Sequence, residues 1–277
     1  MNQVEDLAMK KRNLDRKNYI IKKIQDMRLL DDNLMSLVFS DNVQAVQLVL
    51  RIILGKDDLR VVNVRTEDEH LAVGKRSVIF DVRAVDSRGT VYDIEVQRAD
   101  RGAGVRRARY NASLLDTRLL EAGEDDFNKL ADKYVIFITE NDVMKQGKAL
   151  YSYVFMEETT HELLNDGSHI IYVNGAYEND DSDIGKLMHD FRCADPRRMN
   201  FDRLAIDVDY FKNGGGQSKM CRIVEELCNE ARYEQIEIGV RNLIENGFKD
   251  IAQIAKLLGT TTDVVNQIIN KNDIKLS

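Results

Sequence analysis

The chain has 277 residues, 43% of them hydrophobic and 31% charged, a composition typical of a globular protein rather than a disordered one. Its net charge of −7 argues against a protein that binds polyanions over its whole surface, so any nucleic-acid contact must come from a local basic region. No apolar run approaches the roughly 20 residues that span a bilayer, and Cys193, Cys221 and Cys228 lack the spacing of metal ligands. We therefore expect reduced thiols, a cytoplasmic location and no membrane partner.

The N-terminal part of the chain is predicted to be helical. Residues 1–30 are highly charged and are expected to form a helical arm. Residues 32–54 show the apolar periodicity of a helix, interrupted at Ser40-Asp41-Asn42 by a turn that is expected to supply an N-cap. Gly55 then provides a helix stop.

Three strands are expected next, over Leu59–Val64, Ser77–Val85 and Thr90–Gln97. The last two are joined by Asp86-Ser87-Arg88-Gly89, which is turn chemistry with a glycine able to adopt positive φ. Two alternating runs joined so tightly predict an antiparallel hairpin.

A helix is predicted from Gly104 to Ala122, closed by Gly123, and two apolar strands follow over Lys133–Thr139 and His169–Val173. This order predicts an α/β fold, a mixed sheet flanked by helices, as a core over residues 31–212. Residues 213–218 are predicted to form a linker, and residues 213–277 are predicted to form a helical C-terminal region.

The end of the chain has the length and turn of a helix-turn-helix unit, with helices over Asp250–Leu258 and Thr262–Ile269. Asn266 and Gln267 on the second helix can hydrogen-bond base edges, but that helix carries no arginine. A packing hairpin is the favoured interpretation, and base reading stays the alternative.

The predicted hairpin carries the main candidate site. Asp81 lies in an otherwise apolar strand, and Glu95 and Gln97 share one face of the next strand because side chains alternate. Two carboxylates brought together on adjacent strands repel each other, and a divalent cation relieves this. An ordinary hairpin with one polar face is the competing interpretation of the spacing.

The pattern Asp81, thirteen intervening residues, then Glu95-Val96-Gln97 resembles the D…(D/E)-x-K core of PD-(D/E)XK nucleases. The string is similar to that of the nuclease family transposases, a bacterial subfamily that includes recombination-promoting nucleases. The flanks also resemble it, in the helix that starts at Asp32 and in the helix bearing Arg107, Arg109 and Tyr110.

The resemblance implies a restriction-endonuclease-like fold and a phosphodiester hydrolase. It implies that Asp81, Glu95 and the Val96 carbonyl bind Mg²⁺, with Mn²⁺ as an alternative, and that Gln97 takes the position of the motif lysine. An acidic residue of the first helix often supports such sites; Asp32 is the candidate, and Asp31 and Asp41 compete with it.

The helix that follows the hairpin is rich in arginine, which suits phosphate binding. The residues expected to contact DNA are Arg98, Arg106, Arg107, Arg109 and Tyr110. The competing interpretation is a solvated helix face whose arginines pair with the acidic majority.

The leading hypothesis is thus a metal-dependent DNA endonuclease linked to mobile elements or recombination, acting as a homodimer if it cuts both strands. One alternative is a catalytically decayed DNA-binding protein on the same fold, favoured by the neutral Gln97. The other is a non-catalytic interaction protein assembled through its C-terminal helices, favoured by the acidic total charge.

Overall fold

The structure is a computed structural model that describes residues 3–70, 78–98, 100–117, 119, 125–272 and 274. The chain forms two compact units, one of residues 21–220 and one in which residues 1–20 group with 221–277. Within the described ranges no single helix is long and apolar enough to cross a bilayer, and the pair 32–39 and 43–54 reaches that length only across a 110° bend. All three cysteines are free thiols.

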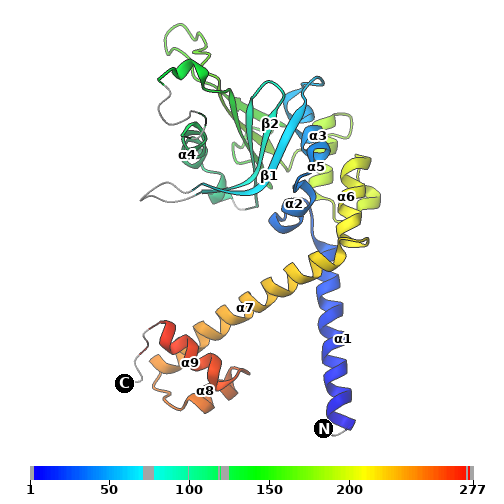
Figure 1. Cartoon of the computed structure of the whole chain (residues 1–277), viewed down its shortest axis with the longest axis vertical. Coiled ribbons are helices and arrows are strands. Elements are labelled where there is room, and N and C mark those ends of the chain that lie inside the picture. Colours follow the sequence, from blue (N-terminus) through cyan, green and yellow to red (C-terminus); the bar gives the residue numbers. More distant parts are fainter. Residues whose placement is uncertain are drawn as a thin grey trace. The chain divides into compact units, whose positions relative to one another are not determined.

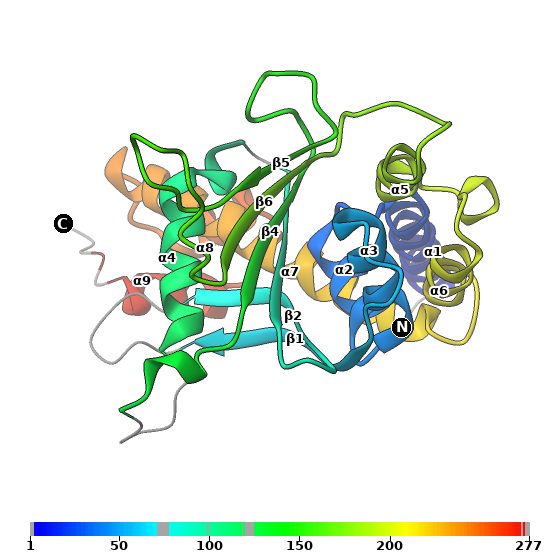
Figure 2. The same ribbon diagram turned by 90° about the horizontal axis from the view of Figure 1, so that it is seen from above.

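The unit of residues 21–220 is built on a mixed sheet (Figures 1 and 2). Its strands are β1 (Val61–His70), β2 (Val78–Asp86), β3 (Val91–Gln97), β4 (Lys133–Thr139), β5 (Leu150–Tyr153) and β6 (Ser168–Asn174). In the described chain they form one six-stranded sheet in the order β1-β2-β3-β4-β6-β5. The β3–β4 and β4–β6 pairs are parallel, and the other pairs are antiparallel.

Helices cover both faces of this sheet. They are α2 (Asp32–Phe39), α3 (Val43–Leu54), α4 (Val105–Asp116), α5 (Asp183–Arg192) and α6 (Asp202–Lys212), with short 3-10 helices η1 (Asp100–Ala103), η2 (Phe127–Lys129) and η3 (Pro196–Arg198). In Figure 2, α4 lies on one side of the strands, and α2, α3, α5 and α6 lie on the other. The predicted α/β fold with a mixed sheet flanked by helices is confirmed.

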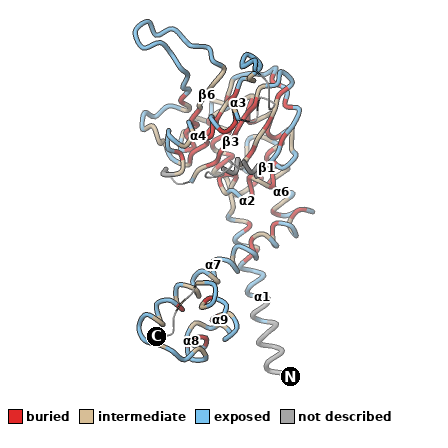
Figure 3. The backbone as a smooth tube through the Cα atoms, turned by 60° about the vertical axis from the view of Figure 1, so that its left-hand side comes forward, coloured by how far each residue is buried: buried red, intermediate tan, exposed pale blue. Residues whose placement is uncertain are grey.

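The core lies between these layers and includes β3, which is buried at every residue but its last (Figure 3). One cluster joins α4 to the sheet, and its buried members are Val91, Ala103, Ala108, Ala112, Leu114, Leu115, Val135, Phe137, Tyr151 and Tyr172. The apolar run of β4 is buried along nearly its whole length, as expected for a central strand with helices on both faces.

Most element ends agree with the sequence patterns. Asn42 caps α3 by accepting a hydrogen bond from the Ala45 amide, and Gly55 ends that helix at a φ of 62°. The first predicted strand begins two residues later than expected and runs on to His70. Strand β5 was not predicted at all. The predicted strand start at Ser77 lies outside the described residues. The helix predicted to run from Gly104 to Ala122 ends at Asp116 instead.

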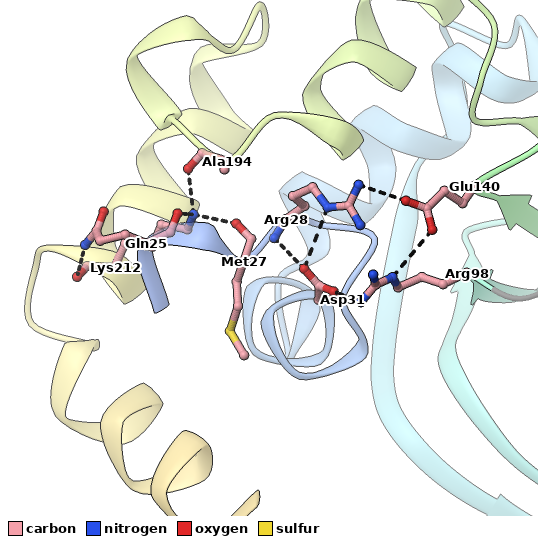
Figure 4. Close-up of polar contacts among 8 residues, drawn as sticks. All are labelled: Gln25, Met27, Arg28, Asp31, Arg98, Glu140, Ala194 and Lys212. Atoms are coloured by element: carbon pink, nitrogen blue, oxygen red, sulfur yellow. Dashed lines mark hydrogen bonds and ion pairs between the residues drawn. The ribbon is translucent and has the colours of Figure 1, made fainter. Parts of the chain in front are cut away.

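A buried lysine joins three segments of this unit (Figure 4). Lys212 is fully buried at the end of α6, and its Nζ donates to the carbonyl oxygens of Gln25, Met27 and Ala194 at 2.8, 2.5 and 2.6 Å. Burial lowers the pKa of Lys212 to about 8. The three acceptors match the three N–H donors of an ammonium group, so Lys212 is charged at neutral pH.

The other unit is helical. It contains the start of α1 (Gln3–Asp26), most of α7 (Gln217–Glu245), α8 (Ile251–Leu257) and α9 (Thr262–Lys271). Val240, Ile254, Ala255, Val265 and Ile268 form its buried core, as the apolar faces of the two last helices predicted. Asp250 and Thr261 cap α8 and α9. In the same unit Arg16 pairs with Glu225 at 3.0 Å.

Candidate active site

The β2–β3 hairpin sets the spacing of the candidate carboxylates. Arg83 pairs with Asp93 and Val82 with Ile94, so the same register carried one residue further puts Asp81 opposite Glu95. Opposed residues point to the same face of a sheet. The Asp81 Oδ2 atom also accepts a hydrogen bond from the Val96 amide at 2.9 Å, which fixes this carboxylate against β3.

Glu95 is the most constrained member of the site. Its side chain is fully buried, and its Oε2 lies 2.6 Å from Nη2 of Arg107 on α4. Its Oε1 is buried without a hydrogen-bond partner. Burial and the charge of Asp81 raise the pKa of Glu95 to about 8, although Arg107 acts in the opposite direction. The Arg107 cation thus compensates only part of the cost of this buried carboxylate.

Asp93 is a third carboxyl on the same face of β3. It is fully buried, its Oδ1 has no hydrogen-bond partner, and Asn111 reaches its Oδ2 only at 3.4 Å. Burial raises its pKa well above the usual range, and the charges of Glu95 and Asp81 raise it further. Alternation along β3 puts Asp93 on the face of Glu95, but nothing in the sequence indicates that it is buried there.

The site fits a hard divalent cation. It has two buried carboxylate oxygens that lack donors, on Glu95 and Asp93, and a third carboxylate on Asp81. In the described chain no group of three or more His, Cys, Asp or Glu side chains is arranged to hold a metal ion, so a cation here would need ligands from water or substrate as well. Mg²⁺ suits such a site because it binds through one or two carboxylates and completes its shell with water and phosphate oxygens.

Gln97 lies at the open end of β3 and is half-buried. A Cβ atom added to Gly102 in η1 would lie 1.7 Å from the Gln97 Oε1, so this glycine makes room for the glutamine side chain. The Gly102 carbonyl in turn accepts a hydrogen bond from Nη1 of Arg107 at 3.1 Å. Gln97 and Arg107 therefore meet at the same short 3-10 helix.

Arg98 belongs to an ion-pair network beside the site (Figure 4). Its Nη1 lies 2.6 Å from Oδ1 of Asp31 and its Nε lies 3.5 Å from Oε2 of Glu140. Arg28 pairs with the other oxygen of Glu140 at 2.8 Å. The arginine predicted to contact DNA is thus held by two carboxylates, although its side chain remains 54% exposed.

The first-helix acids occupy different positions. Asp31 forms ion pairs with Arg98 and Arg28, whereas Asp32 is exposed in the first turn of α2. The surrounding protein and the charge of Asp31 raise the pKa of Asp32, and the cations of Arg98 and Arg107 act in the opposite direction. The supporting role of Asp32 stays a prediction.

The predicted DNA-binding residues of α4 point in two directions. Arg106 and Arg109 are exposed, Arg107 reaches Glu95, and Tyr110 is half-buried against the core beneath the helix. The spacing of three residues puts Arg107 and Tyr110 on one face of the helix, but it does not show that this face is the one turned to the sheet. Asp41 is exposed in the α2–α3 turn.

Comparison with known proteins agrees with this geometry. The family model for PD-(D/E)XK nuclease family transposases matches residues 41–179, half of the chain, and the range includes Asp81, Glu95 and Gln97. No match was found among curated proteins or among solved structures. Together with the mixed sheet and the hairpin carboxylates, this match shows that the chain belongs to the PD-(D/E)XK nuclease family transposases.

Proposed function

We propose that the protein is a metal-dependent endonuclease that hydrolyses phosphodiester bonds of DNA, with Mg²⁺ as its cofactor and Mn²⁺ as a substitute. The observation that carries the proposal is the fully buried Glu95, which lies beside Asp81 and has one carboxylate oxygen without a donor. A fold gains nothing in stability from such an arrangement, because burial of crowded carboxylates is costly. Costly features of this kind concentrate at functional sites.

Asp81 and Glu95 would hold the cation, with the Val96 carbonyl as a further ligand. The cation supplies charge neutralisation at the scissile phosphate and lowers the pKa of the attacking water. Gln97 can orient a water molecule through its amide, because it offers both a donor and an acceptor. The exposed Arg106 and Arg109 would hold phosphates on either side of the cut.

The test is a plasmid-nicking assay at low salt with Mg²⁺, Mn²⁺ or EDTA. We expect nicking with either metal, none in EDTA, and a loss of at least 100-fold in Asp81→Asn and Glu95→Gln. Asp57→Asn is the matched control, because it removes an exposed carboxylate between α3 and β1. Equal nicking by the purified wild type and Glu95→Gln would refute the proposal.

The second candidate is a catalytically decayed DNA-binding protein. Two observations favour it: Gln97 is neutral, and the Glu95 side chain already pairs with Arg107. Salt-sensitive retention of DNA without nicking in either metal would select this candidate. If the wild type cuts both strands, we propose a homodimer, because one site cuts one strand. A protein that binds no nucleic acid at low salt would instead be an interaction protein.

A further inference from the structure

The proposed site lacks a cation at the position where the family motif has lysine. Gln97 can donate hydrogen bonds, but it cannot neutralise the negative charge that develops on a phosphate during hydrolysis. The structure brings a different cation to this place. Arg107 arrives from α4, and its Nη2 lies 2.6 Å from Oε2 of Glu95.

Arg107 spans the boundary between the buried site and solvent. Its side chain is 37% exposed, whereas that of Glu95 is fully buried. The guanidinium lies 5.8 Å from the ring centroid of Phe137, the residue opposite Glu95 on β4. Its Nη1 donates to the Gly102 carbonyl at 3.1 Å. The side chain is therefore aimed into the site and still meets solvent.

Arg107 and a divalent cation would compete for the same carboxylate. Among the residues that the structure describes, Arg107 is the cation that contacts Glu95, so without a metal its guanidinium is the partner of the Glu95 Oε2 atom. A divalent cation bound to Glu95 replaces Arg107 as the partner of this carboxylate and weakens the contact between Glu95 and the guanidinium. The released guanidinium is then free to engage a phosphate, with which arginine forms paired hydrogen bonds.

We propose that Arg107 is a catalytic residue: it pairs with Glu95 without metal and contacts the scissile phosphate once a divalent cation binds. It thus supplies the positive charge that Gln97 lacks. This inference rests on the proposed function, and it adds a residue whose DNA contact depends on the metal. Arg106 is its natural comparison, because it is the preceding residue of α4 and its side chain is exposed.

The test is binding of a fluorescent DNA duplex, measured by anisotropy in EDTA and in Ca²⁺, which takes the same oxygen ligands as Mg²⁺. We expect Arg107→Ala to weaken binding by less than about twofold in EDTA and by about tenfold in Ca²⁺, the scale of one charged hydrogen-bonded contact. Arg106→Ala should weaken binding by the same factor in both conditions. The proposal would be overturned if Arg107→Ala lost the same DNA affinity in EDTA and in Ca²⁺, or lost none in either. A wild type that does not bind DNA would also overturn it.

Arg107→Lys keeps a cation beside Glu95 and serves if the alanine variant does not fold. Its loss, about threefold, should again be confined to Ca²⁺, because lysine cannot form the paired contact. A loss equal in EDTA and Ca²⁺, or none in either, would count against the proposal. The readout does not depend on cleavage. A wild type that fails to nick plasmid in Mg²⁺ would refute the nuclease, while a metal-dependent effect of Arg107 would still stand.

Discussion

Replacement of Glu95 by glutamine should stabilise the metal-free protein at alkaline pH. The folded state raises the pKa of Glu95 from 4.5 to about 8, chiefly through burial. Between these values the folded protein keeps a proton that the unfolded chain has lost, so stability falls as pH rises. At about 1.4 kcal/mol per pH unit, the charge costs at most about 5 kcal/mol above pH 8. Glutamine avoids this cost but gives up the ion pair with Arg107, so we expect a net gain of about 2 kcal/mol at pH 8.5.

The assay is urea unfolding in EDTA, followed by tyrosine fluorescence, since the chain has ten tyrosines and no tryptophan. The difference between Glu95→Gln and wild type should be small at pH 5 and widen steadily to pH 8.5. Asp57→Asn should show a difference that does not change with pH, because that residue is exposed. A Glu95→Gln protein that is less stable than wild type at every pH would refute the reasoning, since it would make Glu95 a net stabilising residue.

Two further substitutions test the buried lysine of the fold and the position of Gln97. Lys212→Met leaves three carbonyl oxygens without their buried donor and should lower the free energy of unfolding by about 3–5 kcal/mol in urea titrations, whereas the exposed Lys219→Met should change it by less than about 0.5 kcal/mol. An effect of Lys212→Met as small as that of the control would contradict the role of the lysine. Gly102→Ala places a methyl group 1.7 Å from the Gln97 Oε1 and should slow plasmid nicking at least tenfold, whereas Gly104→Ala, with open space around its Cβ, should cut like wild type. Equal rates for the two alanine variants would show that the position of Gln97 does not matter.

Much of the fold could be predicted from local patterns. The hairpin could be predicted because residues 86–89 have a turn-forming sequence between two alternating runs. Strand β4 could be predicted because its apolar run is nearly continuous. Strand β5 was missed because its four residues, Leu150–Tyr153, are too few to show a period. The grouping of residues 1–20 with residues 221–277 is a long-range contact that no local pattern carries.

Only part of the candidate site could be predicted from the sequence. Strand alternation and the tight turn predict that Asp81 and Glu95 come together and that Gln97 shares the face of Glu95. The family resemblance singled out these three residues as a site. The burial of Asp93 depends on the packing of α4 over β3, which a single strand does not encode. The contact between Arg107 and Glu95 depends on which face of α4 turns to the sheet, and the spacing of arginines along a helix does not determine that.

The central claim is that Asp81 and Glu95 together hold the cation. The most direct measurement is Mn²⁺ binding by electron paramagnetic resonance, with wild type beside Asp81→Asn, Glu95→Gln and the control Asp57→Asn. The account predicts one bound Mn²⁺ per chain in wild type and in Asp57→Asn, and at least tenfold weaker binding in each of the other two variants. Unchanged Mn²⁺ binding in both Asp81→Asn and Glu95→Gln would contradict it, because the cation would then be bound elsewhere.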